Sequence, residues 1–463
     1  MYETLIAQSD RPVPVLALFE EDVEAALGSD ADRALAKAHG FKGQAGRLVL
    51  ASGPDGALDR VLFGLGKAAA PDAMALRSLS ARLPDGDYRL ELSRPLIEPE
   101  ALALGWALGS YVFDRYKPRK DRQRPRLVTP AGADSAAVQR IAQACFLARE
   151  MVDTPAADMG PLQIETIARE IAGEHGARIE VTSGQALADG YPAVHAVGRA
   201  ADPARAPRIV EIGWNMDRAD LPLLAVVGKG VVFDSGGLDI KPASGMRNMK
   251  KDMGGSAHAL ALGRLVMQSG LPVRLTVLVP TVENAISGDS FRPGDVLKTR
   301  KGLSVEVGNT DAEGRLILAD ALARAGELKP DLTIDFATLT GAARVALGPE
   351  LPPFYTDDED LAAAIAEASR AVADPVWRMP LWRGYREAVE AEIADLRNDS
   401  ADWAQAGSVT AALFLQRFAP ETGAWAHFDI FAWNPRARPG WPAGGEAQAL
   451  RAVFEMLRRR YAG

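Results

Sequence analysis

The chain contains 463 residues, of which 48% are hydrophobic and 25% are charged. These values are typical of a soluble globular protein that is long enough to form two domains. The formal net charge is −8, so nucleic-acid binding would need a local basic patch. The single cysteine excludes a disulfide framework within the chain.

The sequence shows no signal for export or membrane insertion. Residues 1–10 lack the basic stretch and following apolar stretch of a secretory signal. No apolar run is long enough to span a bilayer. We therefore expect a cytoplasmic protein that does not contact a membrane. Cys145 lies in an apolar, helix-like stretch, which indicates a packed thiol rather than a nucleophile.

The first part of the chain alternates between strand-like and helix-like segments. Residues 14–19 and 60–65 have the apolar runs of buried strands, and residues 98–116 carry apolar side chains at helical spacing. Such alternation predicts an α/β layer domain.

A segment rich in proline and charge, residues 117–130, then breaks this pattern. We predict that it is a linker, which divides the chain into a smaller domain at 1–130 and a larger domain at 131–463. The overlapping basic run 115–126 could be a solvated linker or a nucleic-acid contact. It has no interleaved aromatic residues beyond Tyr116, which favours the linker.

The larger domain continues the alternation, beginning with a helix for which Asp134 is a suitable N-cap. The predicted helices cover residues 134–152, 162–173, 257–269 and 319–327. The predicted strands cover residues 178–182, 208–212, 223–227, 274–279 and 332–337. These strands are continuous apolar runs, as in sheets that are covered on both faces. We predict a mixed, mainly parallel sheet between helices.

Several loops that follow predicted strands carry carboxylates. In open α/β sheets, the loops at the carboxyl ends of the strands meet in one crevice. The carboxylates concerned are Asp234, Asp252, Asp311 and Glu313. They would repel one another unless cations lay between them, and oxygen ligands suit Mg²⁺, Mn²⁺ or Zn²⁺. Their spacing alone leaves ordinary glycine-rich turns as an equal alternative.

Three cationic residues accompany these carboxylates. Lys229 alone would be a solvated surface residue, but metal ions beside it would lower its pKa and let the neutral amine act as a ligand. Lys241 would stay charged and could polarise a carbonyl group. Arg315 cannot readily lose its proton, so it suits anion binding rather than a role as a base.

Other kinds of site lack their motifs. Lys229 is followed by Gly230 rather than by Ser or Thr, so the phosphate-binding P-loop is absent. The five histidines form no HExxH motif, and His427 is interpreted as a hydrogen-bonded core residue. Ser235 lacks the first glycine of a nucleophile elbow.

Taken together, these segments resemble the leucyl aminopeptidases, the M17 metallopeptidases. NTDAEGRL at 309–316 is similar to the family signature, and VGKGVVFDSGG at 227–237, with the following IKP, resembles another metal-binding stretch, as does MKKDMGG at 249–255. Weaker similarity covers most of 145–433. The resemblance implies a homohexamer whose subunits have a macro-like N-terminal α/β domain and a catalytic C-terminal domain.

The resemblance also implies a ligand set for two divalent ions, Mn²⁺ or Zn²⁺, with Mg²⁺ as a third alternative. Asp234 and Glu313 would bridge the two ions. Lys229 and Asp252 would complete the tighter site, and Asp311 would complete the more exchangeable one.

The remaining implied roles concern the substrate, which is a peptide with a free N-terminus and a Leu-like first residue. Lys241 would polarise the scissile carbonyl, and Arg315 would hold a bicarbonate ion that acts as general base. The α-amine would bind one metal and Asp252. The pocket for the first side chain would be lined by Met249, Thr338, Leu339 and Gly341.

Two segments depart from the family pattern. Phe431 stands where the family has a small residue, and residues 439–454 differ from the usual tail. Both put the side-chain preference in question rather than the metal chemistry. Two other functions remain as alternatives: a nucleic-acid-associated scaffold that uses residues 115–126, and a dinuclear phosphatase, for which histidine ligands are missing.

Overall fold

The computed structural model describes residues 4–118, 125–400 and 405–462, and the chain forms two compact units. Unit 1 comprises Met1–Phe146 and Pro435–Ala443, and unit 2 comprises Leu147–Asn434 and Gly444–Gly463. The division falls within helix α5, Ser135–Asp153. The amide groups of Ala136 and Ala137 both donate to Asp134 Oδ1, at 2.9 and 3.0 Å, which confirms the predicted N-cap.

Unit 1 is built on a six-stranded sheet with the order β1-β6-β5-β2-β4-β3. All neighbouring strands are parallel except β3 and β4, which are antiparallel. The strands are β1 (Leu5–Ile6), β2 (Val13–Phe19), β3 (Leu48–Ser52), β4 (Leu58–Gly66), β5 (Gly86–Leu92) and β6 (Pro125–Val128). The helices are α1 (Val23–Ala26), α2 (Asp30–Ala38), α3 (Arg77–Ser80) and α4 (Pro99–Gly109). The α/β prediction for this part of the chain is confirmed.

Two predicted elements of unit 1 differ from the structure. The helix predicted at 98–116 ends at Gly109, where the Ser110 amide donates to Ala107 O in a tightened last turn. The predicted linker 117–130 contains strand β6, which pairs with β1 and β5. Its charged side chains hid a strand in which buried and half-buried residues alternate. The central part of that linker, 119–124, lies outside the described residues.

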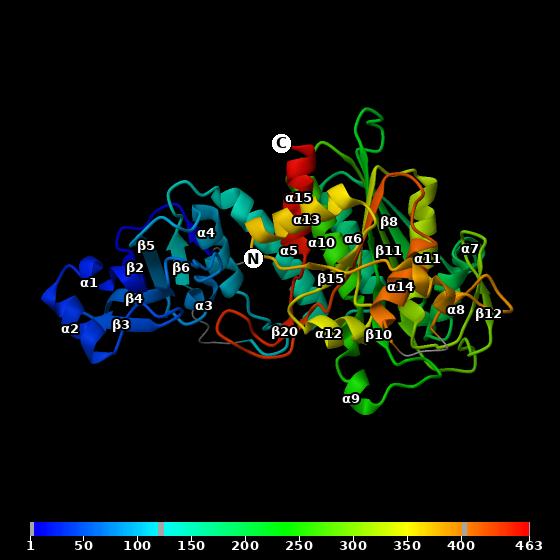
Figure 1. Ribbon diagram of the computed structural model, residues 1–463, viewed down its shortest axis with the longest axis horizontal. Coiled ribbons are helices and arrows are strands. Elements are labelled where there is room, and N and C mark those ends of the chain that lie inside the picture. Colours follow the sequence, from blue (N-terminus) through cyan, green and yellow to red (C-terminus); the bar gives the residue numbers. More distant parts are fainter. Residues whose placement is uncertain (1–3, 119–124, 401–404, 463) are drawn as a thin grey trace. The chain divides into compact units, whose positions relative to one another are not determined.

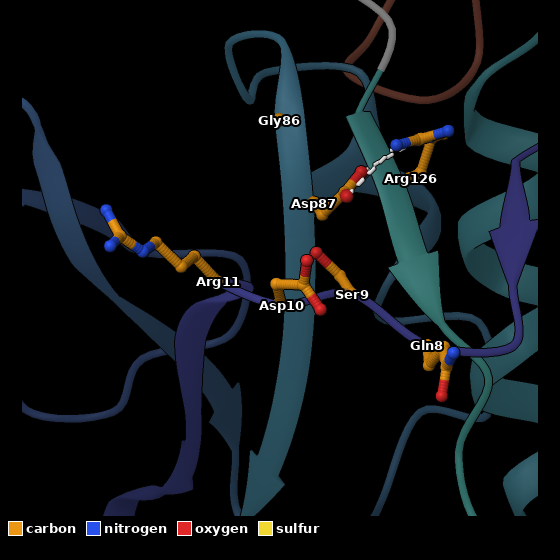
Figure 2. A pocket seen from close by; sticks show the side chains of 7 residues that line it. All are labelled: Gln8, Ser9, Asp10, Arg11, Gly86, Asp87 and Arg126. Carbon is orange, nitrogen blue, oxygen red and sulfur yellow. Dashed lines mark hydrogen bonds and ion pairs between the residues drawn. The ribbon is translucent and has the colours of Figure 1, made fainter.

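Strand β6 also borders a pocket of about 750 Å³ in unit 1, shown in Figure 2. Arg126 Nε and Nη2 donate to the two Asp87 carboxylate oxygens at 2.7 and 3.0 Å. This hydrogen bonding lowers the pKa of Asp87 against the effect of burial. Arg126, the last residue of the basic run 115–126, is therefore already paired with a carboxylate.

Unit 2 is built on a nine-stranded mixed sheet with the order β16-β15-β18-β14-β9-β11-β8-β7, to which β10 adds by pairing with β11. The four central pairings β18–β14, β14–β9, β9–β11 and β10–β11 are parallel. The strands are β7 (Arg178–Ser183), β8 (Arg208–Trp214), β9 (Leu223–Gly228), β10 (Gly230–Asp234), β11 (Arg274–Asn284), β14 (Leu332–Ala337), β15 (Pro353–Tyr355), β16 (Trp377–Arg378) and β18 (Ala424–Asp429).

Helices cover both faces of this sheet, as predicted (Figure 1). The helix α10, Gly254–Gln268, packs through Gly263 against Val277 of β11. The next residue of β11, Leu278, belongs to a core cluster with the opposite helix α11, Glu313–Glu327. Since successive strand residues point to opposite faces, α10 and α11 lie on opposite sides of the sheet.

The other helices of unit 2 are α6 (Pro161–Glu174), α7 (Gly184–Gly190), α8 (Pro192–Gly198), α9 (Ala243–Met246), α12 (Gly341–Leu347), α13 (Glu359–Ala371), α14 (Gly407–Gln416) and α15 (Leu450–Tyr461). Short 3₁₀ turns occur in both units: η1 (Glu20–Asp22) in unit 1, and η2 (Pro203–Arg205), η3 (Met249–Met253) and η4 (Arg383–Val389) in unit 2. Two small sheets, β12 (Val296–Lys298) with β13 (Ser304–Glu306) and β17 (Leu396–Arg397), and β19 (Trp433–Asn434) with β20 (Gly444–Gly445), complete the fold. None of the helices in the described residues is long and apolar enough to cross a membrane.

Candidate metal centre

The predicted site residues converge at the carboxyl edge of the central strands of unit 2. Lys229 directly follows β9, and Thr338 directly follows β14. These strands are parallel neighbours in which Gly228 lies opposite Phe336, so both loops leave the sheet at the same edge. Asp234 ends β10, and Glu313 begins α11, where the positive end of the helix dipole favours a carboxylate.

Lys229 is the centre of the first charge cluster. Its ammonium group lies 2.7 Å from Asp252 Oδ2 and 3.0 Å from Glu313 Oε1, and it donates to Thr338 O at 3.1 Å. All three charged residues are at most 3% exposed. Lys229 is thus a buried residue, and the surface position expected from its sequence context alone is wrong.

Lys241 joins the two other carboxylates. Its Nζ lies 2.8 Å from Asp234 Oδ2 and forms a closer ion pair with Asp311 Oδ1. Asp234 Oδ1 accepts hydrogen bonds at 2.9 Å from the Gly236 amide and from Asn284 Nδ2. Two lysines therefore balance the charge of the four carboxylates only in part.

The arrangement fits a divalent cation. One oxygen from each of Asp234, Asp252 and Glu313 lies within 4.8 Å of the others, among the described residues. Glu313 Oε2 is buried and has no hydrogen-bond partner in the part of the chain that the structure describes. A buried carboxylate oxygen without a partner is costly, and a hard cation would satisfy it.

The pKa values of the carboxylates reflect this crowding. Burial and the neighbouring Asp234 raise the pKa of Glu313 to about 8. The same two causes raise the pKa of Asp311 to about 6. Burial also opposes the charge of Asp252, but Lys229 outweighs it and lowers that pKa to about 2. Without a cation, the site therefore holds a proton on Glu313 at neutral pH.

The pKa values of the two lysines are also raised, because the neighbouring carboxylates favour the charged amines. Burial disfavours the charge of Lys229, but Asp252 and Glu313 outweigh burial and raise its pKa. Lys241 behaves in the same way, with Asp234 as the main opposing charge. Both amines are ammonium groups in the metal-free protein. Lys229 would need the added positive charge of bound metal to lose its proton and act as a ligand.

Two asparagines that the sequence analysis missed hold the carboxylate loops. Asn284, at the end of β11, bridges Asp234 and Thr310 O, to which its Nδ2 donates at 3.2 Å. Asn398 Oδ1 accepts from the amides of Gly308 and Asn309 at 2.8 and 3.2 Å. Asn284 lies beyond the strand end predicted from the apolar pattern, which is why it escaped notice.

The predicted substrate residues lie around the first charge cluster. Thr338 Oγ1 donates to Asp252 Oδ1 at 2.9 Å, and the Leu339 amide donates to Asp429 Oδ1 at 3.0 Å. Gly341 begins α12 and is exposed. Met249 begins η3, three residues before Asp252, and is half-buried.

Arg315 is largely buried, and its Nε has no partner among the described residues. Burial lowers its pKa to about 10, so the guanidinium stays charged at neutral pH. Other predictions are confirmed. Cys145 is buried, and His427 Nδ1 lies 2.5 Å from Asp335 Oδ1 in the core.

Fold and site together define an α/β protein with a carboxylate-rich centre suited to divalent cations. The profile of the cytosol aminopeptidase family, catalytic domain, matches residues 146–454, and that of the M17 aminopeptidase N-terminal domain matches residues 13–130. The chain belongs to this family, as its motifs predict, and it is an aminopeptidase, a class of hydrolase. The nucleic-acid scaffold receives no support.

Related proteins are similar to this chain over nearly the whole length of both. A probable cytosol aminopeptidase of Geobacter sp. (strain M21) is 37% identical over 97% of both chains. The crystal structure of a cytosol aminopeptidase from Coxiella burnetii is 42% identical, with a TM-score of 0.92 over 99% of both chains. The bottromycin maturation enzyme BotP, in a structure that contains Mn, is 33% identical, with a TM-score of 0.87 over 98% of this chain and all of that one.

Proposed function

We propose that the chain removes the N-terminal residue of peptides at a centre for two divalent ions. The observation that carries this proposal is the convergence of Asp234, Asp252 and Glu313 within 4.8 Å, with Glu313 Oε2 left without a partner. When bound, Mn²⁺, Zn²⁺ or Mg²⁺ would supply Lewis-acid activation of water and of the scissile carbonyl. The manganese in the BotP structure supports such a cation for this fold.

The residues of the centre divide into bridging and terminal ligands. The family resemblance implies that Asp234 and Glu313 would each serve both ions. Glu313 lies beside Lys229, and Asp234 lies beside Lys241. Lys229 and Asp252 would complete one position, and Asp311 the other. The burial of Asp252 also suits it to recognise the α-amine of the substrate, which would restrict hydrolysis to the first peptide bond.

Two positively charged side chains, those of Lys241 and Arg315, would assist the reaction. Lys241 keeps its proton and is 14% exposed at the edge of the centre, so it can donate a hydrogen bond to the carbonyl oxygen as negative charge develops there. Arg315, whose Nε lacks a partner among the described residues, would hold a bicarbonate ion that takes a proton from the attacking water.

The pocket for the first side chain would lie beside Met249 and the loop formed by Thr338, Leu339 and Gly341. The family resemblance implies a Leu-like first residue. We further propose that the protein acts in the cytoplasm as a homohexamer. The family's description as cytosol aminopeptidases supports the location. Light scattering of the purified protein would test the assembly.

The test of the function is the release of p-nitroaniline from several amino-acid p-nitroanilides, including leucine p-nitroanilide. Turnover should disappear with a chelator and return with Mn²⁺, Zn²⁺ or Mg²⁺. Turnover that a chelator leaves unchanged would contradict the proposal. N-acetylated substrates serve as the matched control, because they lack the free amine and should not be cleaved.

A further inference from the structure

A second group of cations lies beside the metal centre and has no role in the reaction proposed above. It consists of Lys251 and Arg344, which both contact Phe431, and we call these three residues the cationic pocket. The Arg344 guanidinium lies 4.4 Å from the centre of the Phe431 ring, and Lys251 Nζ lies 5.5 Å from it. The aromatic ring thus holds two positive charges near each other.

Arg344 is half-buried in the first turns of α12. Its Nη1 donates to Thr340 O at 3.1 Å, and no carboxylate of the described residues lies within ion-pair distance of it. The carboxylates whose charge acts on it are Asp429 and Asp252. Asp429 is fully engaged, because its Oδ1 accepts from two amides and its Oδ2 from two hydroxyls. The guanidinium therefore lacks a bidentate partner.

Lys251 is only 3% exposed, which is unusual for a lysine. Among the residues that the structure describes, its carboxylate neighbour is Asp252, whose Oδ1 is 3.5 Å away, while Asp252 Oδ2 lies closer to Lys229, at 2.7 Å. Asp252 is also a proposed metal ligand. Burying a lysine next to an arginine is costly, and a bound anion would offset part of that cost.

The cationic pocket adjoins the position proposed for the first residue of the substrate. Lys251 precedes Asp252, which would recognise the α-amine. A Cβ atom on Gly341 would lie 3.6 Å from Arg344 Nη2, so the guanidinium extends over the loop proposed to line the first side chain. Phe431 lies two residues beyond the end of β18, whose last residue, Asp429, pairs with Ala337 just before that loop.

We propose that the pocket selects peptides whose first residue is acidic, glutamate or aspartate. This inference rests on the proposed function and specifies its substrate class. The carboxylate of the first side chain would accept from Arg344 and Lys251, while its methylene groups contact Phe431. An apolar side chain such as that of leucine would instead leave both cations desolvated and without a partner.

The test compares the hydrolysis of glutamate and glutamine α-p-nitroanilides by the metal-loaded protein. The two substrates have nearly the same shape and lack a C-terminal carboxylate, so only the charge of the side chain differs. We expect kcat/KM to be about tenfold or more higher for glutamate. Equal values, or a preference for glutamine or leucine, would overturn the proposal.

Variants assign the preference to these residues. Arg344→Leu should lower kcat/KM for the glutamate substrate by about tenfold or more and raise it for leucine p-nitroanilide. Arg370→Leu, on the exposed end of α13, is the matched control and should keep the preference for glutamate. Lys251→Met provides a second test should Arg344→Leu fold poorly. If both pocket variants lower turnover of glutamate and leucine substrates equally, the residues do not determine specificity.

Binding distinguishes a wrong specificity from a wrong function. Free L-glutamate should raise the thermal unfolding midpoint of the metal-loaded protein more than L-glutamine does, and Arg344→Leu should abolish that difference. A protein that cleaves leucine p-nitroanilide but shows no such difference retains the proposed function and refutes the acidic pocket. A protein that cleaves nothing but shows the difference refutes the peptidase function and supports the pocket.

Discussion

Gly314 lies directly against the side chain of Lys229, the lysine at the centre of the first charge cluster. A Cβ atom at position 314 would come within 2.6 Å of Lys229 Nζ and 2.8 Å of its Cδ. Gly314 is also the second residue of α11, after Glu313. The absence of a side chain therefore lets the helix that carries one proposed ligand pack against another.

Gly314→Ala should displace Lys229 and weaken metal binding. We expect Mn²⁺ affinity, measured by isothermal titration calorimetry, to fall by about 10- to 100-fold. Overpacking should also lower the free energy of unfolding by about 1–3 kcal/mol. Gly173→Ala is the control, because Gly173 is exposed in α6 and a Cβ there meets nothing within 4 Å. It should stabilise the protein by about 0.5–1 kcal/mol and leave metal affinity unchanged. Equal affinities for both variants would refute this packing role.

Metal binding should depend steeply on pH. Glu313 has a pKa of about 8 in the metal-free protein, and Lys229 has a raised pKa, so both must lose a proton to act as ligands. Between pH 6 and 8, Mn²⁺ affinity should therefore rise by about 10- to 100-fold per pH unit. Calorimetry in buffers of different ionisation enthalpy would count the released protons. Glu313→Gln should release one proton fewer, and a pH-independent affinity would contradict the assignment.

The raised pKa of Glu313 should also make the stability of the metal-free protein depend on pH. The pKa of Glu313 is raised on folding from an ordinary value of 4.5, so its contribution to stability is fully present below pH 4.5 and is lost as the pH rises through about 8. Bound metal would stabilise the ionised Glu313 carboxylate and so offset this loss of stability. The increase in unfolding midpoint caused by Mn²⁺ should thus be larger at pH 8 than at pH 6, which differential scanning calorimetry would measure.

How far the sequence predicted the site depended on where each residue lies. The convergence of Asp234, Asp252 and Glu313 followed from the rule that parallel strands end at one edge. The start of α11 at 313 rather than 319 was missed because carboxylates precede its apolar pattern. Lys251 and Arg344 were missed because a lysine beside an aspartate, or an arginine in a short helix, is usually solvated.

The fold was predictable to a similar degree. The strands β9 and β14 are continuous apolar runs, and their bounds were predicted to within one residue. No bounds were predicted for β10 or β18, and the predicted strand was too short for β11. That strand continues through Pro280 to Asn284, where pairing with β8 and β10 outweighs the local sequence. Strand β6 was hidden by Arg126 and by the charged residues that precede the strand. Pairing partners such as these are distant in sequence and cannot be read from a local pattern.

Asn284 should be needed to position Asp234. Asn284→Ala removes hydrogen bonds to Asp234 Oδ1 and Thr310 O in a buried place, so the free energy of unfolding should fall by about 1–3 kcal/mol, with weaker Mn²⁺ binding. Thr276→Val on the same strand is the control. The buried Thr276 hydroxyl has no partner among the described residues, so its removal should not destabilise the protein. Denaturant unfolding would measure both variants, and equal losses would contradict the positioning role.

The buried pair of His427 and Asp335 should make stability depend on pH. Burial opposes the charge of His427, but Asp335 outweighs it and raises the pKa above 6.5. The contribution of the pair is therefore fully present below pH 6.5 and is lost as the pH rises through the folded-state pKa. Asp335→Asn should cost about 3–5 kcal/mol at low pH and less at high pH. Urea unfolding at pH 6 and pH 9, in excess chelator, would test this, and a cost that grows with pH would contradict it.

We propose that this aminopeptidase works through two ions held by Asp234, Asp252 and Glu313 with Lys229 and Asp311. The most direct measurement is a titration of the chelator-treated protein with Mn²⁺, in which bound metal and peptide hydrolysis are recorded on the same samples. We predict two ions per chain, turnover that follows the filling of the second position, and, in Glu313→Gln, weaker Mn²⁺ binding with loss of turnover. Full turnover with one ion or none, or normal turnover by Glu313→Gln, would contradict it.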